Sequence, residues 1–182
     1  MNTTDAAWLA GILDGEGTLL IVEYRRKLVY NPSFEAQVAV TKTDRRIVAR
    51  CKDLAGGTLI GPVGRGKPEL WKPAYRWAVN CQKATSVLRL TFPYLVAKQE
   101  QAAILLQLTS QINAGACKGQ FGRKAASPEQ VEYRRMLKHA VQALNHRGGG
   151  AIPQEKAAAL AEVRRQLKSG ISSFSSLLAI AT

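Results

Sequence analysis

The residue whose chemistry stands out first is Glu16, which lies between two glycines after an apolar run. The run reads WLAGILDGEGTL over residues 8–19 and has the apolar spacing of a helix. Glycine tolerates the left-handed backbone that ends many helices, so Gly15 and Gly17 predict a helix end beside this acid. A carboxylate held at such an end can bind a divalent cation. The alternative is that DGEG is an ordinary helix end and turn.

Net charge is the strongest global feature of the sequence. The 182 residues carry 26 Lys+Arg against 13 Asp+Glu, which gives a net charge of +13. The excess lies mostly between Leu20 and Arg89, where 14 basic residues stand against 5 acids. A field of this sign attracts polyanions, and nucleic acid is the expected partner. The alternative is a solvated basic surface, as in ribosome-associated proteins.

Several classes of protein are excluded by composition. No apolar run approaches the ~20 residues of a membrane-spanning helix, and the opening residues MNTTDAA lack a signal-peptide pattern. Cys51, Cys81 and Cys117 have no CxxC spacing and predict neither a disulfide framework nor a zinc site, so we expect them to be reduced and structural. We expect an intracellular protein. Abundant alanine with modest lysine and asparagine favours a bacterial or phage-infected cell over an organelle.

Periodicity and turn residues predict one αββαββα unit followed by further helices. The first helix is expected over residues 6–13, with Thr4 or Asp5 as its N-cap. Residues 1–112 would form this core, and residues 113–182 a linker and C-terminal helical extension. The other expected elements are strands within 18–30 and 34–41, a helix in 44–54 capped by Thr43, two strands within 55–80, and helices in 84–90, 95–112, 129–145 and 154–168.

The run from Leu9 to Gly17, LAGILDGEG, resembles the LAGLIDADG motif of homing endonucleases. All nine positions match the motif or differ conservatively. The resemblance extends over residues 6–112, because that family has the same element order. It implies an α+β fold of the αββαββα type with a saddle-shaped antiparallel sheet, to which this chain adds C-terminal helices.

A single copy of the motif implies a homodimer in which the two motif helices pack on each other. Small residues at i, i+3, i+4 and i+7 let two helix backbones approach closely. Bulky Trp8, Leu9, Ile12 and Leu13 are then left for the core of each protomer. The interface residues predicted in this way are Ala7, Ala10, Gly11 and Asp14, and we expect Asp14 to cap or hydrogen-bond rather than to catalyse.

The resemblance also implies a set of catalytic residues. Glu16 takes the place of the more usual Asp and would bind a divalent cation together with the carbonyl of Gly15. Arg45 would organise solvent and phosphate, and Lys98 would lie near the cleaved backbone, where a cation stabilises developing charge. Thr41 stands where the family often has glutamine. The expected ion is Mg²⁺, with Mn²⁺ as a substitute and Ca²⁺ supporting binding without cleavage.

Contacts with double-stranded DNA are expected on the sheet. A strand of about ten residues spans ~33 Å, so a dimer could follow roughly 20 base pairs. Trp71 and Trp77 are expected to pack in the core or a hairpin. The DNA-binding residues predicted are Tyr24, Arg25, Arg26, Lys27, Gln37, Arg65, Lys67, Lys72, Tyr75 and Arg76.

Three functions remain open at this point. The first is a site-specific endonuclease that hydrolyses both DNA strands and leaves short 3′ overhangs, as the resemblance implies. The second is a cleavage-inactive protein with the same fold, either an RNA maturase or a DNA-binding regulator. The third is a ribosome-associated structural protein, which explains the charge but not the acid between glycines. The presence of Glu16, Arg45 and Lys98 favours the enzyme.

Overall fold

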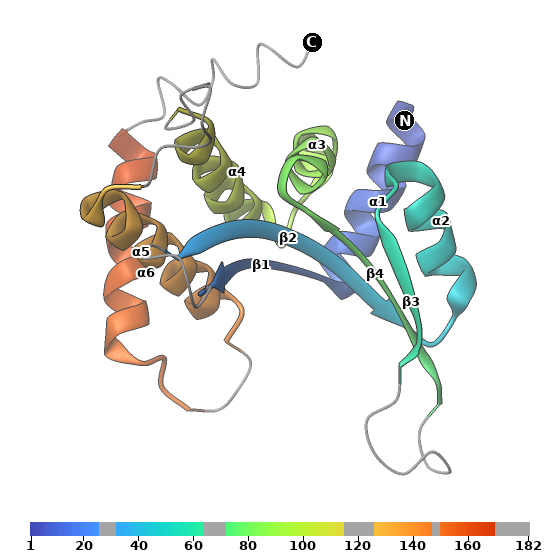
Figure 1. Cartoon of the computed structure of the whole chain (residues 1–182). Helices are drawn as coiled ribbons and strands as arrows, with labels where there is room; N and C mark the ends of the chain where they lie inside the picture. The colour runs from blue at the N-terminus through green and yellow to red at the C-terminus, as the bar shows by residue number, and fades with distance from the viewer. Residues whose placement is uncertain (26–31, 64–71, 115–125, 147–149, 170–182) are drawn as a thin grey trace. The chain divides into compact units, whose positions relative to one another are not determined.

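The computed structural model describes residues 1–25, 32–63, 72–114, 126–146 and 150–169. The described elements follow the predicted αββαββα order, and three further α-helices come after it (Figure 1). Arg26, Lys27, Arg65, Lys67, Trp71 and Cys117 lie outside the described residues. The elements are α1 (Thr3–Glu16), β1 (Gly17–Tyr24), β2 (Ser33–Lys42), α2 (Arg45–Ala55), β3 (Thr58–Val63), β4 (Ala74–Asn80), α3 (Cys81–Thr91), η1 (Phe92–Tyr94), α4 (Gln99–Ala114), α5 (Pro128–Leu144) and α6 (Gln154–Ser169).

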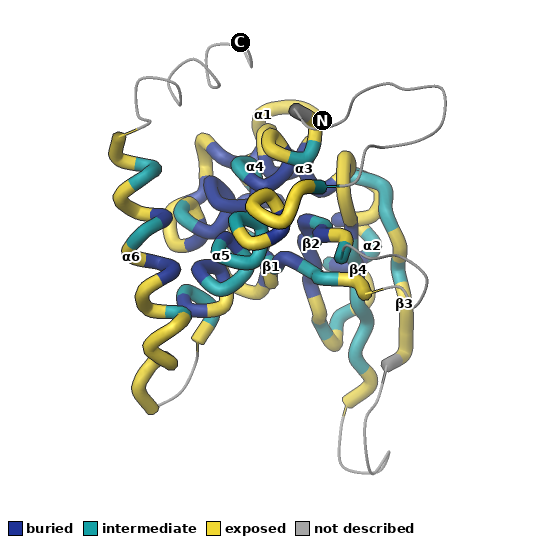
Figure 2. The backbone as a smooth tube through the Cα atoms, turned by 60° about the vertical axis from the view of Figure 1, so that its left-hand side comes forward, coloured by how far each residue is buried: buried dark blue, intermediate teal, exposed yellow. Residues whose placement is uncertain are grey.

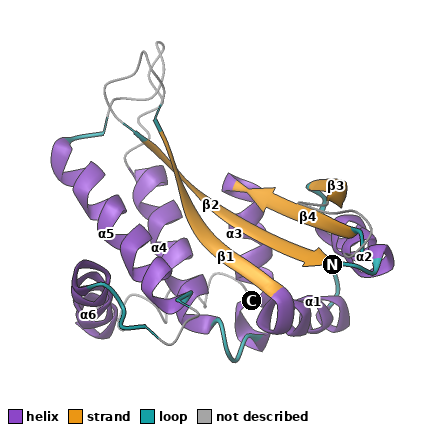
Figure 3. Ribbon diagram, turned by 90° about the horizontal axis from the view of Figure 1, so that it is seen from below, coloured by secondary structure: helices purple, strands orange, loops and turns teal. Residues whose placement is uncertain are grey.

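The four strands form one antiparallel sheet in the order β1-β2-β4-β3 (Figure 3). The α+β fold class predicted from the sequence is therefore confirmed. The chain groups into two compact units. The first unit comprises Met1–Leu19 and Ala36–Ala102, and the second comprises Leu20–Glu35 and Ala103–Thr182. The boundary at residue 112 stays a prediction.

The core of the first unit is built from alternate residues of two paired strands and from one side of α1. In β2 and β4, Val38 lies opposite Val79 and Val40 opposite Trp77, and all four side chains are buried. Buried stretches of the backbone are dark blue in Figure 2. Leu9 and Leu13 of α1 are fully buried as well. Trp77, which was expected to pack in a core or hairpin, donates its indole N–H to the carbonyl of Gly56 at 2.7 Å.

Gly57, beside this tryptophan, shows why the turn before β3 needs glycine. Its φ is +89°, and a Cβ there would lie 2.5 Å from Cγ1 of Val79. A side chain at this position would therefore both strain the backbone and collide with the core.

The second unit contains α5 and α6, whose facing residues pack together. Ser127 begins α5 with a capping box, in which its side chain accepts from the N–H of Gln130 and the Gln130 side chain accepts in return from the N–H of Ser127. The helix thus begins at Pro128, one residue before the range that the sequence predicts. Apolar residues of α5 and α6 are buried here: Val131, Leu137, Ala140, Val141, Ala143, Ala159, Leu160 and Val163.

Several element ends differ from the sequence prediction. Asn2, rather than Thr4 or Asp5, caps α1 by accepting from the N–H of Asp5 at 2.8 Å. Asp44, rather than Thr43, caps α2. At the other end of α1, Gly17 has φ −70° and ψ 151°, so the helix ends by passing directly into an extended strand and not through a left-handed glycine.

None of the described helices is both long enough and apolar enough to span a bilayer.

Candidate active site

Glu16 is the last residue of α1, and its side chain is 49% exposed. The motif helix thus ends with a carboxylate that solvent can reach. Its Oε1 lies 2.5 Å from Nζ of Lys42, which is the last residue of β2 and is 28% exposed. Lys42 was not among the residues predicted for the site. Its place at the end of an alternating strand, directly after Thr41, was the only signal that could have indicated it.

Lys98 reaches the same end of α1 from the segment before α4. Lys98 is only 7% exposed, and its Nζ donates to the carbonyl oxygens of Leu13 at 2.8 Å and of Asp14 at 2.5 Å. The last four carbonyls of a helix have no intrahelical partner, and a cation there also meets the negative end of the helix dipole. Lys98 therefore acts as a C-terminal cap on the motif helix, while the catalytic role predicted for it stays a prediction.

Asp14 completes this arrangement in the opposite direction. Its carboxylate oxygens accept from the backbone N–H of Val96 at 2.7 Å and from that of Lys98 at 2.9 Å. The hydrogen-bonding role expected for Asp14 is confirmed. These bonds hold residues 95–98 against the end of α1, and for this reason α4 begins at Gln99 and not at Leu95.

The electrostatics of this cluster favour cations. The end of a helix carries roughly half a negative charge, to which the Glu16 carboxylate adds a full one. Two ammonium groups, those of Lys42 and Lys98, are found here. Within the described residues, no three His, Cys, Asp or Glu side chains are grouped as a metal site. A metal ion at Glu16 would therefore need further oxygen ligands from backbone, water, phosphate or a second chain.

Thr41 and Arg45 lie along the chain on either side of Lys42. Thr41 is exposed and stands opposite Arg76 in the β2–β4 register. Arg45 is exposed and is the first residue of α2, directly after the Asp44 cap. Hydrogen bonds from the side chain and the backbone N–H of Arg46 lower the pKa of Asp44 to about 2. Arg45 follows Lys42 by three residues, across the turn between β2 and α2.

The outer side of α1 presents small residues. Ala7, Gly11 and Gly15 are exposed, and a Cβ added at either glycine would meet no atom within 4 Å. Ala10 was predicted for this side, but it is fully buried in the chain's own core. The reason is the helical period of 3.6 residues. Ala7, Gly11 and Gly15 are four residues apart, so each is rotated by only about 40° from the one before. Ala10 comes three residues after Ala7 and is rotated the other way, towards the buried side that holds Leu9 and Leu13.

Strand parity divides the residues predicted to contact DNA on β2 and β4. Gln37 and Arg76 lie on the sheet face opposite Trp77 and Val79, and Tyr75 lies on the same face as those two core residues. Nη2 of Arg76 donates to Oε1 of Gln37 at 2.9 Å. Nε2 of Gln37 donates to Oδ1 of Asn80, also at 2.9 Å. Asn80 was not predicted for this surface. It is the last residue of β4 and the N-cap position of α3, where asparagine is common for another reason.

The three other candidates that the structure describes are accessible. Lys72 and Tyr24 are exposed. The Arg25 side chain is 78% exposed and lies 3.4 Å from Glu23.

Of the three cysteines, Cys51 is buried, and burial raises the pKa of its thiol to about 11. Cys81 is exposed, and both cysteines are free thiols, as the sequence predicts.

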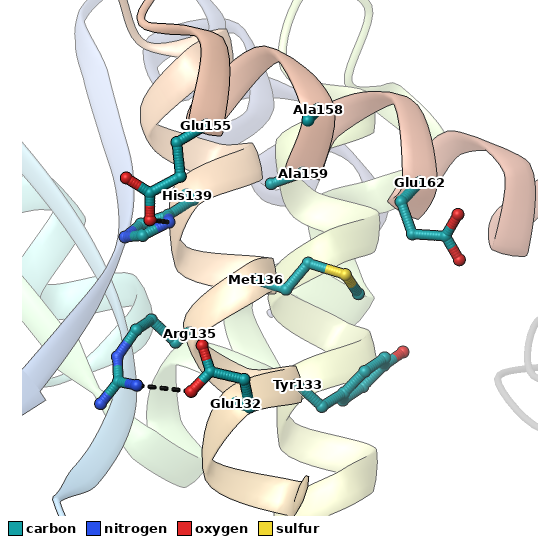
Figure 4. Close-up of a pocket in the computed structure, with 9 residues that line it drawn as sticks. All are labelled: Glu132, Tyr133, Arg135, Met136, His139, Glu155, Ala158, Ala159 and Glu162. Carbon is teal, nitrogen blue, oxygen red and sulfur yellow. Dashed lines mark hydrogen bonds and ion pairs between the residues drawn. The ribbon is translucent and has the colours of Figure 1, made fainter.

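The second unit holds a cavity of about 470 Å³ that is lined by α5 and α6 (Figure 4). Its charged groups are already paired within the chain. His139 lies 3.0 Å from Glu155, and Arg135 lies 2.6 Å from Glu132. The first pair joins α5 to α6, and the second lies within α5. No cluster of metal ligands is found in this described part of the chain.

No protein-family profile matches the sequence, and no curated protein does so either. Solved structures do match. The homing endonuclease I-CvuI, in complex with its target in the presence of Ca, has a TM-score of 0.62 at 21% identity, covering 92% of this chain and 94% of that chain. The archaeal intron-encoded I-Vdi141I, complexed with DNA, has a TM-score of 0.60 at 13% identity, covering 89% and 96%. The I-SmaMI LAGLIDADG homing endonuclease, bound to cleaved DNA, has a TM-score of 0.54 at 15% identity, covering 89% of this chain but 48% of that one. The chain has the fold of the LAGLIDADG homing endonucleases.

Proposed function

We propose that this protein is a homodimeric, divalent-metal-dependent endonuclease that cuts both strands of a DNA site of about 20 base pairs. The observation that carries the proposal is the end of α1, where the motif acid Glu16 remains accessible while the carbonyls behind it are capped. The fold supports the proposal, since the solved structures that share it include enzymes complexed with DNA and one bound to cleaved DNA.

The residues present fit a Mg²⁺ ion. Carboxylate and carbonyl oxygens are the ligands that Mg²⁺ takes from proteins, usually one or two of them beside water and phosphate. Glu16 and the Gly15 carbonyl would hold the ion, and when bound it would supply a Lewis acid for phosphodiester hydrolysis. Lys98 fixes the helix end on which both ligands stand.

Other side chains of the cluster act on charge. Lys42 pairs with Glu16 in the chain as it stands, and its ammonium could bind a phosphate beside the carboxylate. Arg45, exposed at the start of α2, would bind the phosphate and stabilise charge that develops during the reaction. Thr41 offers a hydroxyl in the position before Lys42 that can hold solvent.

Two copies of the chain are needed for two cuts. This chain covers 94% of the I-CvuI chain but only 48% of the I-SmaMI chain, so it supplies one αββαββα unit where a longer protein carries more sequence. The exposed side of α1, with Ala7, Gly11 and Gly15, has no bulky side chain to prevent close helix packing. A dimer through α1 would bring two Glu16 carboxylates together.

One observation favours a second candidate, a DNA-binding protein that does not cleave. The ammonium of Lys42 already satisfies Glu16, as it would in a protein that has no use for a metal ion.

Cleavage of a randomised duplex library separates these candidates. Purified protein is incubated with the library and Mg²⁺, and the cut ends are sequenced. If the protein is an endonuclease, the sequenced ends should come from one family of long sites and carry short 3′ overhangs. Cut ends no more frequent than those from a Glu16→Gln preparation would leave the binding protein as the better account.

A further inference from the structure

The polar side chains of Arg76, Gln37 and Asn80 form one connected chain on the sheet face opposite the core. Gln37 stands opposite Asn80, and Arg76 belongs to a pair two steps further along the same face. The pair between them is Ala39 and Ala78, whose small side chains leave room for Arg76 to extend along the sheet. Arg76 reaches Gln37 at 2.9 Å, and Gln37 reaches Asn80 at 2.9 Å.

The chemistry of the three groups fixes the direction of every hydrogen bond. A guanidinium can only donate, so the oxygen of Gln37 must face Arg76. The amino group of Gln37 then faces Asn80 and requires the oxygen of that side chain. The amino group of Asn80 and the remaining N–H groups of Arg76 are left for other partners, and all of them are donors.

Arg76 also keeps its charge available. No carboxylate pairs with it among the residues that the structure describes, and its one hydrogen-bond partner there is the neutral amide of Gln37. Gln37 alone would suit adenine, which offers one acceptor and one donor in the major groove. Its acceptor and one of its donors are already used by its neighbours, so Gln37 serves to orient Arg76 and Asn80 instead.

We propose that this triad, Arg76–Gln37–Asn80, reads a guanine in the major groove, an inference that rests on the DNA-binding function proposed above. Guanine presents two acceptors, N7 and O6, which match a fixed set of donors. Adenine and cytosine each place an amino group there, so a donor would meet a donor. Arg76 contacts the base, and Gln37 is a positioning residue that holds the guanidinium in the plane required for two parallel bonds.

Binding selection in Ca²⁺ tests this reading without requiring cleavage. Wild-type protein is expected to select guanine at one position of each half-site. Arg76→Ala should reduce the preference at that position by roughly 5- to 150-fold, the range for one bidentate base contact. Arg89→Gln, which removes an exposed arginine from α3, serves as the control with matched loss of charge and should leave every preference unchanged.

Two variants of Gln37 separate positioning from mere structure. Gln37→Leu removes the acceptor for Arg76 and should relax the same guanine position, while binding to all sequences weakens much less. Gln37→Glu keeps an acceptor for Arg76, so the guanine preference should persist. The added carboxylate pairs with the guanidinium and repels phosphate, so binding to all sequences should weaken. Circular dichroism melting confirms that each variant is folded.

The outcomes distinguish this inference from the proposed function. If Arg76→Ala weakens binding to all sequences equally and no position changes its preference, Arg76 contacts phosphate and the inference is wrong. If that happens while the selected site is cut in Mg²⁺, the proposed endonuclease stands without it. If guanine is lost in Arg76→Ala but the selected site is never cut, the reading of guanine stands and the endonuclease does not.

Discussion

Glu16 and Glu23 lie near the two ends of β1, and they differ in exposure and in the number of ion-pair partners. Glu16 belongs to the candidate site, whereas Glu23 forms structural ion pairs. Glu16 is 49% exposed and has Lys42 as its ion-pair partner. The Glu23 side chain is 7% exposed and lies 2.7 Å from Lys138 and 3.4 Å from Arg135. The hydrogen bond from Lys138 holds the pKa of the Glu23 carboxyl below its ordinary value.

The comparison teaches that charge alone does not mark function in this basic chain. Glu23 is neutralised from several sides by α5, so its role is to hold β1 to that helix within one unit. Glu16 is balanced by a partner that can exchange with solvent, because surface ion pairs contribute only ~0–1 kcal/mol. An accessible acid on a capped helix end can take a new ligand, and an enclosed one cannot.

The largest expected effect comes from the exposed side of α1. Gly11→Leu places a bulky side chain where two copies of the helix would meet, so it should abolish dimer formation and cleavage together. Sedimentation velocity at micromolar concentration, with and without DNA, measures the first. Gly150→Leu, at another glycine with open space around it, is the control and should remain dimeric. A wild-type protein that is monomeric even on DNA would contradict the dimer.

A change at Glu23 should affect stability and not function. Glu23→Gln removes the carboxylate that pairs with Lys138 and one of the two that pair with Arg135. It should lower the free energy of unfolding by roughly 1–3 kcal/mol. Glu132→Gln breaks the other ion pair of Arg135, but the Glu132 side chain is 71% exposed, so its effect should stay below about 1 kcal/mol. Urea unfolding measures both, and equal losses would show that enclosure does not separate these acids.

Lys42→Ala sharpens the account of Glu16. Removing the ammonium takes away one competitor for the carboxylate. Ca²⁺ should therefore bind the protein–DNA complex up to about fivefold more tightly, as expected for loss of one surface ion pair. Isothermal titration calorimetry reports this affinity. Lys42→Arg keeps the charge and should behave as wild type. Weaker Ca²⁺ binding by Lys42→Ala would mean that Lys42 supports the ion and does not compete with it.

The smallest effect is a pH dependence at the cap of α2, beside Arg45. The pKa of Asp44 falls from 3.8 to about 2 on folding, so its contribution to stability is complete above pH 3.8 and is lost as the pH falls towards 2. Asp44→Asn keeps a capping side chain that does not titrate. The difference in Tm between the two proteins should therefore shrink as the pH is lowered from 5 to 2, and a constant difference would exclude this role.

Local rules were enough to predict the order of elements but not where several of them end. The hydrophobic periods and turn residues predicted the αββαββα order, because those signals lie within a few residues of each other. The start of α4 at Gln99 depends on Asp14, which accepts N–H bonds from a segment far along the chain. No local pattern around Leu95 could indicate that.

The site shows the same division. The motif predicts Glu16 at the end of its helix, where the structure places it. Lys42 and Asn80 were missed because their contacts depend on which strands lie side by side. Ala10 was misplaced because positions i+3 and i+4 were assigned to the same side of the helix. Strand pairing decides these contacts, and it is set by long-range packing.

The central claim is that Glu16 holds the metal ion that cleavage requires. Glu16→Gln keeps the size of the side chain and removes its negative charge, so it should abolish cleavage of the selected DNA site in Mg²⁺ while specific binding persists. Binding is measured in parallel by fluorescence anisotropy, so that loss of cleavage is separated from loss of the complex. Cleavage by Glu16→Gln at the wild-type rate would contradict the claim.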